Sequence, residues 1–190
     1  MAAAMGNVDE RDSWEVHFAD TMRGGQYLSN WKMAEIHAKE SPDRVRELEA
    51  WGAVFDRTKE GKILQRNFGG HAHPRLAHVG DRTGLEMIRT LQDHGVHQGF
   101  EHYQECTITK LLKDGDRVVG AFGYDRESGR FRVFHAGAVI LATGGFQGNP
   151  DLMSRYFGQW ADRLILRANP RSTGDGLILG MDIGAATSHS

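Results

Sequence analysis

The chain has 190 residues, with 23 Lys and Arg against 25 Asp and Glu, which leaves a net charge of −2. The basic residues are spread along the sequence, which argues against a nucleic-acid-binding protein, and a 39% hydrophobic content excludes a disordered chain. The single cysteine, Cys106, excludes an internal disulfide and a thiolate zinc site. No apolar run reaches the ~18 residues of a transmembrane helix, so we expect no membrane span, no secretory signal and a cytoplasmic location.

The first hundred residues are predicted to be mainly helical. Apolar residues recur at helical spacing, Gly24-Gly25 and Gly52 are typical helix stops, and Ser41-Pro42 indicates a helix start. In the last of these helices, Leu85, Ile88 and Leu91 are expected to form the buried stripe. The predicted helices cover 9–22, 30–39, 42–51 and 81–94.

The segment 67–79 shows no periodicity and is predicted to be a long ordered loop. It carries His71, His73 and His78, which raises three possibilities. They could bind a metal, they could hydrogen-bond within a structural loop, or they could lie near a redox centre. The spacing of His71 and His73 suits a strand rather than a helical metal-binding pair, and only Asp81 is a nearby carboxylate, so we expect no metal site.

After residue 100 the hydrophobic period changes to two. Three strands are predicted over 107–112, 117–124 and 131–134, and the pairs Asp114-Gly115 and Ser128-Gly129 indicate the hairpin turns between them. The apolar run 138–142 is predicted to be a buried parallel strand. Short helices are expected over 150–157 and 176–183.

Two glycine clusters are the main candidates for a binding site. The first, Thr143-Gly144-Gly145, follows the apolar run and would let the backbone approach a ligand closely because no Cβ intrudes. The second surrounds Asp175, which lies between Gly174 and Gly176 at a helix start. Its carboxylate could cap the helix or accept hydrogen bonds from ribose or ribityl hydroxyls. Two flanking glycines favour the ligand, because a simple cap does not require both.

With these residues described, the chain resembles the flavoprotein subunit of succinate dehydrogenase and fumarate reductase. The matching motifs are long and ordered, and they cover 6–21, 49–63, 65–71 and 81–84. The resemblance implies an α/β fold that is part of a Rossmann-like FAD-binding domain, with an antiparallel β-meander and flanking helices. Residues 1–190 would then be its central part.

The resemblance also implies FAD as the cofactor. Ala142, Thr143, Gly144 and Gly145 would line it, Asp175 would hydrogen-bond it, and the backbone at Thr107 would lie by the adenine. The implied reaction is hydride transfer between a dicarboxylate-like substrate and FAD. An iron–sulfur subunit is the implied partner, with a peripheral position at the inner face of the plasma membrane.

The chain departs from the family pattern at three places. It carries no Gly-x-Gly-x-x-Gly strand, and the flavin-attaching histidine of the family would precede Met1. The substrate-binding histidine and catalytic arginine of the family would follow Ser190, so no catalytic residue is assigned here. The segment 146–158 is closer to soluble relatives of the tricarballylate and ketosteroid dehydrogenase type. Such a soluble dehydrogenase, or a non-catalytic piece without flavin, is the alternative function.

Overall fold

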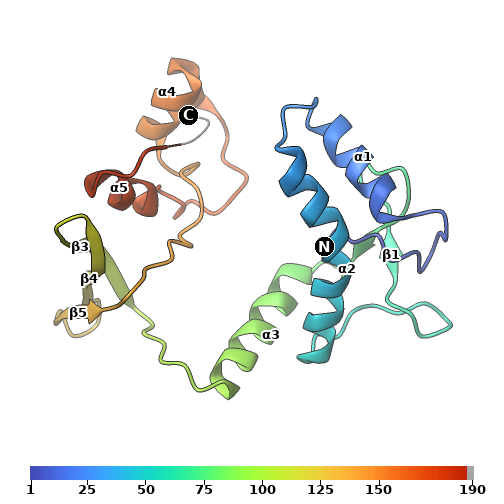
Figure 1. The fold of residues 1–190 in the computed structure, drawn as a ribbon, viewed down its shortest axis with the longest axis horizontal. Helices are drawn as coiled ribbons and strands as arrows, with labels where there is room; N and C mark the ends of the chain where they lie inside the picture. The colour runs from blue at the N-terminus through green and yellow to red at the C-terminus, as the bar shows by residue number, and fades with distance from the viewer. Residues whose placement is uncertain (188–190) are drawn as a thin grey trace. The chain divides into compact units, whose positions relative to one another are not determined.

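The structure is a computed structural model of the chain, and it describes residues 1–187. The chain divides into two compact units, Met1–Glu101 and His102–Ser190. Helices dominate the first unit, and an antiparallel sheet with short helices forms the second (Figure 1). The mixed α/β architecture, with its β-meander and flanking helices, is confirmed.

Three helices build the first unit: α1 over Trp14–Gly24, α2 over Trp31–Ala50 and α3 over Thr83–His97. Helices α1 and α2 pack side by side (Figure 1). Each begins at a side-chain cap, because Ser13 accepts a hydrogen bond from the Val16 amide and Asn30 accepts from the first turn of α2.

Helix α2 corrects the prediction of two separate helices over 30–39 and 42–51. It runs through Pro42 without a break, although proline has no amide hydrogen for the helical ladder. Its buried residues lie on one face on both sides of the proline: Ala34, Ala38, Ser41, Val45 and Leu48. Burial of this continuous face outweighs the local cost of the proline, which a sequence rule for helix starts does not weigh.

The apolar core of the first unit lies between the end of α2 and the extended segments that follow it. Two short strands, β1 over Gln65–Arg66 and β2 over Leu76–Ala77, pair antiparallel, so the predicted loop 67–79 includes the short strand β2. A single bridge joins Arg57 to Ile63 across the expected turn at 59–62. The buried core residues are Ala3, Val45, Leu48, Ala53, Phe55, Ile63 and Ala77.

Helix α3 presents a different face to this core from the one predicted. Leu85, Ile88 and Leu91 are about half exposed. The inward face carries Met87 against the core and the buried Thr90, and it also carries His94, whose ring stacks on Trp51 at 4.1 Å. Apolar spacing therefore identified the helix but not the face that this unit buries.

The second unit contains the predicted meander. Strands β3 (Cys106–Asp114), β4 (Arg117–Asp125) and β5 (Phe131–His135) pair in sequence order and antiparallel. Three helical segments follow: α4 over Pro150–Phe157, the 3-10 segment η1 over Gln159–Arg163, and α5 over Asp175–Asp182. Leu179 of α5 packs on Leu111 and Ala121 of the sheet to form the small core of this unit.

The predicted parallel strand over 138–142 is wrong for the residues described. This segment has no strand structure, and the Ile140 side chain is 91% exposed rather than buried. A strand requires a hydrogen-bonding neighbour, and within residues 1–187 none pairs with this segment. Val139 alone packs against the Leu111–Leu179 core.

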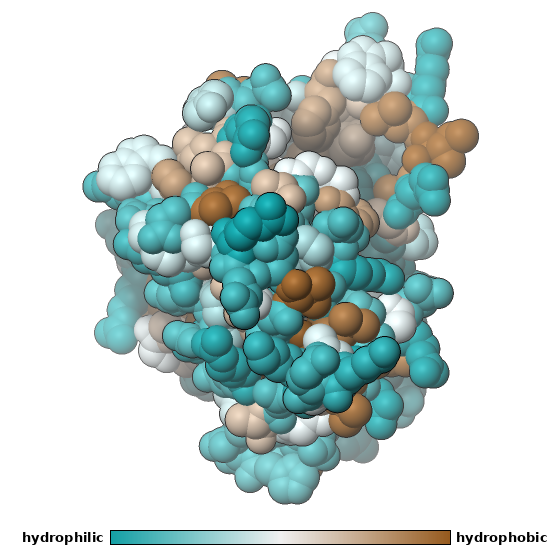
Figure 2. Space-filling view, turned by 90° about the vertical axis from the view of Figure 1, so that its right-hand side faces the viewer, coloured by the Kyte–Doolittle hydropathy of each residue, from teal (hydrophilic) through white to brown (hydrophobic). Residues whose placement is uncertain are grey.

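The surface is largely hydrophilic on the face drawn in Figure 2, with small separate groups of hydrophobic residues. Among the described helices, none has the length and apolar character needed to cross a lipid bilayer.

Candidate functional site

The two glycine clusters singled out from the sequence lie against each other in the second unit. The Gly174 amide donates to the Gly145 carbonyl at 3.2 Å, and the Gly148 amide donates to the Ser172 carbonyl at 2.8 Å. These two backbone bonds join the turn after residue 142 to the loop that leads into α5. The expected pairing of the clusters is therefore present as a tertiary contact.

The start of α5 packs closely on Thr143. A Cβ placed on Gly176 would lie 2.1 Å from the Thr143 Oγ1 atom, a distance that no real side chain tolerates. Gly174 has a left-handed φ of +83°, and a Cβ there would lie 2.6 Å from Leu152 Cδ1. Glycine is required at both positions, at the first by contact and at the second also by backbone conformation.

Asp175 is the first residue of α5, and its carboxylate is exposed. The helix cap is Gly174, and no side chain caps this helix, so the capping interpretation of Asp175 is wrong. One carboxylate oxygen accepts a hydrogen bond from Thr173 Oγ1 at 2.9 Å. A carboxylate has further acceptor capacity, and the positive end of the helix dipole favours its charge at this place.

A cavity of about 350 Å³ lies beside this junction. Three of the predicted site residues line it, namely Ala142, Thr143 and Gly144, together with Gly176 and Met181. The lining does not include Gly145, Asp175 or Thr107. Gly145 and Asp175 nevertheless adjoin residues that do line it.

Thr107 lies in β3, where it pairs with Tyr124 of β4. A Cβ on Gly123 would lie 2.2 Å from the Thr107 carbonyl oxygen, so the two strands approach closely there. Leu111, four residues further along β3, is the contact to α5. Thr107 thus shares the sheet on which the site helix packs, and its assignment to a cofactor stays a prediction.

Asn149 is a site-building residue that the sequence reasoning missed. Its Nδ2 donates to the Thr173 carbonyl at 3.0 Å, and its Oδ1 accepts from the amides of Asp151 and Leu152. One side chain therefore caps α4 and holds the loop before α5. The Asn-Pro pair at 149–150 is a helix-start signature, so the cap was readable from sequence but the tertiary bond was not.

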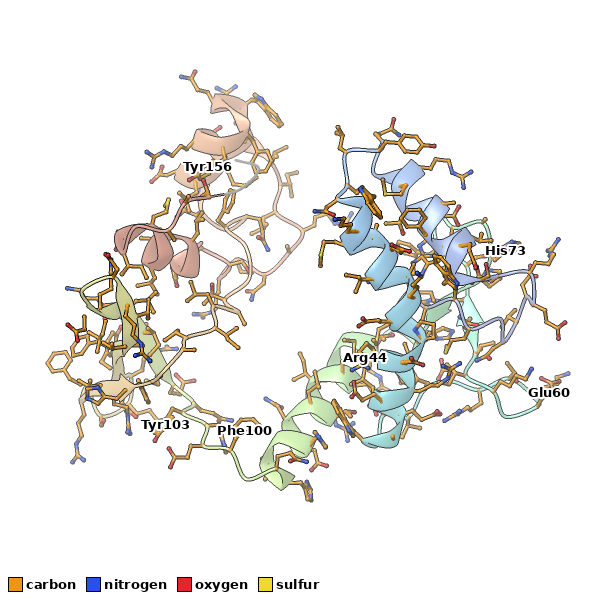
Figure 3. The ribbon with its side chains drawn as sticks, viewed as in Figure 1. Arg44, Glu60, His73, Phe100, Tyr103 and Tyr156 are labelled. Atoms are coloured by element: carbon orange, nitrogen blue, oxygen red, sulfur yellow. The ribbon has the colours of Figure 1, made fainter. Side chains whose placement is uncertain are left out.

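Tyr156 of α4 supplies a second link between the helices around the junction. Its side chain points toward α5 (Figure 3), and its hydroxyl donates to the Met181 sulfur at 3.8 Å. Because Met181 also lines the cavity, α4 supports the cavity wall from behind.

The histidines of 67–79 are engaged in the first unit. His73 Nδ1 lies 2.9 Å from Asp9 Oδ2, and His78 Nδ1 lies 2.8 Å from Asp56 Oδ2. Within residues 1–187, no group of three or more His, Cys, Asp or Glu side chains is arranged to hold a metal ion. The contacts are those of a hydrogen-bonded structural loop.

Comparison with known proteins places this site in a family. The family described as "FAD binding domain" matches residues 1–189. The flavoprotein-like chain of the CoM/CoB fumarate reductase of Methanothermobacter marburgensis is 43% identical over 143 residues, which are 75% of this chain and 26% of that protein. The succinate dehydrogenase flavoprotein subunit of Rickettsia conorii is 34% identical over 154 residues, which are 77% of this chain and 26% of that protein.

Solved structures agree. Mycobacterium smegmatis Sdh1 in complex with UQ1 has a TM-score of 0.84 and 50% identity, and the match covers 96% of this chain and 30% of that one. The open conformation of a flavocytochrome c3 fumarate reductase has a TM-score of 0.81 and 30% identity, with 93% and 30% covered. The chain thus spans between a quarter and a third of the length of these relatives. It belongs to the FAD-binding domain family, among the flavoproteins of succinate dehydrogenase and fumarate reductase.

Proposed function

We propose that this chain forms one wall of the flavin site in an FAD-dependent oxidoreductase that transfers a hydride between a dicarboxylate-like substrate and FAD. The observation that carries the proposal is the contact between the Thr143–Gly145 turn and the start of α5 at Asp175. Family membership supplies the cofactor, and the names of the relatives supply the substrate class.

The residues at the junction fit a flavin dinucleotide. The backbone of Thr143 and Gly144 is exposed, and a Cβ on Gly144 would meet only Ser172 Oγ, at 3.7 Å. A ligand can therefore approach this backbone without meeting a side chain. The neighbouring cavity combines apolar groups, such as Leu141 and Met181, with the polar Thr143, as expected for a cofactor with an apolar ring and a hydroxylated chain.

Each of these residues would contribute binding and orientation. Asp175 would accept hydrogen bonds from cofactor hydroxyls, the amides of the Thr143–Gly145 turn would donate to its polar edge, and Leu141 and Met181 would exclude water. FAD supplies the redox chemistry when bound, because its ring accepts or returns the hydride. The protein's share of the work in this segment is to position and desolvate the cofactor.

We further propose that the complete protein works on the membrane surface with an iron–sulfur protein as its partner. The names of its relatives, which are components of multi-chain enzymes, support this, as does the likeness to Sdh1 in complex with UQ1. The rival function is a soluble dehydrogenase of tricarballylate or steroid substrates.

The test is to purify the full chain and record its visible absorbance, then measure oxidation of succinate and of a ketosteroid with an artificial electron acceptor. We expect bound FAD and activity on the dicarboxylate. The variant Asp175→Ala should bind FAD at least tenfold more weakly, because a hydrogen bond to a charged group is lost. Asp151→Ala, which changes the matching first-turn carboxylate of α4, is the control and should bind FAD normally.

Two results would contradict the proposal. Purification without any flavin, even after addition of FAD, would favour the non-catalytic alternative. Turnover of the steroid with none of the dicarboxylate would leave the flavin site standing and overturn the substrate class.

A further inference from the structure

One end of the first unit is held together by polar side chains rather than by apolar packing. The buried residues of α1 are His17 and Asp20. The loop that lies on α1 is largely solvent-exposed, and Phe68 within it is 64% exposed. This end therefore depends on charges and hydrogen bonds for its attachment, unlike the apolar core around Val45 and Phe55.

Arg75 is the centre of this polar attachment. It has no solvent exposure, and its Nη2 lies 2.8 Å from Asp12 Oδ1 and 2.9 Å from Asp20 Oδ2. The same Asp20 oxygen accepts a hydrogen bond from the Ala72 amide at 2.8 Å. A second tie joins His73 to Asp9 in the same loop, at the His73 side chain labelled in Figure 3. These contacts connect the loop 67–75 to α1 and to the segment before it.

His17 of α1 faces this cluster from the buried side. It is 3% exposed, its ring lies 5.2 Å from the ring of His37 on α2, and it lies 6.2 Å from the ring of His71 in the loop. Burial lowers the pKa of His17 to about 4, and the charge of Arg75 and the two neighbouring imidazoles contribute to this lowering, whereas Asp20 acts to raise it. At neutral pH, His17 is therefore an uncharged packing residue.

We propose that Asp12, His17, Asp20, His71 and Arg75 form an acid-sensitive latch, which releases the loop 67–75 and α1 when His17 takes up a proton. A charge on His17 would sit without solvent beside the guanidinium of Arg75. The apolar core of the unit lies among other residues and has no such group, so it stays folded. The opening is local, as expected where one part of a unit depends on charge and the rest on apolar burial.

The direction of the pH effect follows from the two states of His17. Its pKa is lower in the closed latch than the ordinary value of 6.5, so closure is favoured above pH 6.5 and loses stability as the pH falls below it. Between pH 7 and pH 5 the opening constant should rise roughly twentyfold. His71 acts in the same direction, because burial, followed by Arg75, lowers its pKa. Asp12 acts in the opposite direction, because burial raises its pKa.

Hydrogen exchange of the full chain, read by mass spectrometry and corrected for intrinsic rates, tests the latch. Between pH 7 and pH 5, exchange in 14–24 and 67–75 should rise roughly twentyfold, while exchange in 45–55 stays unchanged. In His17→Gln, which cannot be protonated, the rise should be threefold or less, and adding His71→Gln should remove the remainder. His97→Gln, at an exposed position of α3, is the matched control and should keep the full response.

Equal loss of protection in all three segments, or a full response in His17→Gln, would overturn the latch. If His17→Gln does not fold at pH 7, the imidazole of His17 is titrated by NMR in the unaltered chain. An apparent pKa near 4, with release of 67–75 over the same range, supports the latch, and a pKa near 6.5 refutes it.

Discussion

Gly176 and Thr143 are 33 positions apart in the sequence, yet Gly176 lies so close to Thr143 that a Cβ on the glycine would come within 2.1 Å of the threonine Oγ1. This contact brings the start of α5 onto the turn that follows residue 142. The cavity opens beside these two residues. The geometry of the candidate flavin site therefore depends on the absence of a single methyl group.

Replacing Gly176 by alanine should disrupt the site. The added Cβ forces α5 away from Thr143, at a cost of about 1–3 kcal/mol in the free energy of unfolding, as for other overpacked contacts. We expect a lower melting temperature and FAD affinity at least tenfold weaker, measured by calorimetry and by flavin fluorescence titration. Gly137→Ala is the control, because a Cβ there meets nothing within 4 Å, and it should change neither quantity.

Asn149 can be separated into its two roles by two substitutions. Asn149→Ala removes the cap of α4 and the bond to Thr173, and it should lower the free energy of unfolding by about 1–2 kcal/mol. Asn149→Asp keeps the capping acceptor and loses only the donor to the Thr173 carbonyl. Denaturant unfolding should therefore place it between the alanine variant and the unaltered chain. Equal losses in both variants would show that the cap contributes nothing.

Removing the buried guanidinium should destabilise the first unit strongly. Arg75→Met leaves the carboxylates of Asp12 and Asp20 without their buried partner, a loss of about 3–5 kcal/mol. Arg44→Met, on the exposed face of α2 (Figure 3), breaks only a surface pair with Glu47 and should have a far smaller effect. Denaturant unfolding followed by circular dichroism gives both values, and similar losses would contradict the buried network.

The close approach of β3 and β4 predicts a further glycine requirement. A Cβ on Gly123 would lie 2.2 Å from the backbone oxygen of Thr107, so Gly123→Ala should displace the start of β3 at a cost of about 1–3 kcal/mol. If Thr107 contacts the cofactor, FAD affinity should fall as well. Thr109→Ala, at an exposed position of the same strand, should leave both the melting temperature and FAD binding unchanged.

Local signals in the sequence were sufficient for much of the fold. Alternating apolar residues and the turns at Asp114-Gly115 and Ser128-Gly129 predicted the meander correctly, because hairpin pairing is decided by neighbours in the chain. The two glycine clusters also identified the junction of 143–145 with 174–176. The helix face of α3, the continuity of α2 through Pro42 and the fate of 138–142 were not predicted correctly.

Those failures and the unpredicted contacts have one physical origin. Whether Ile140 is buried, which face of α3 turns inward and which carboxylates surround Arg75 depend on groups distant in sequence. Glycine, turn and cap signals act over a few residues, so the sequence by itself determined the elements and the position of the glycine junction. Only the tertiary structure decided that Gly176 touches Thr143, that Asn149 holds Thr173, and that a buried arginine binds a loop to α1, because packing and charge pairing are settled between segments.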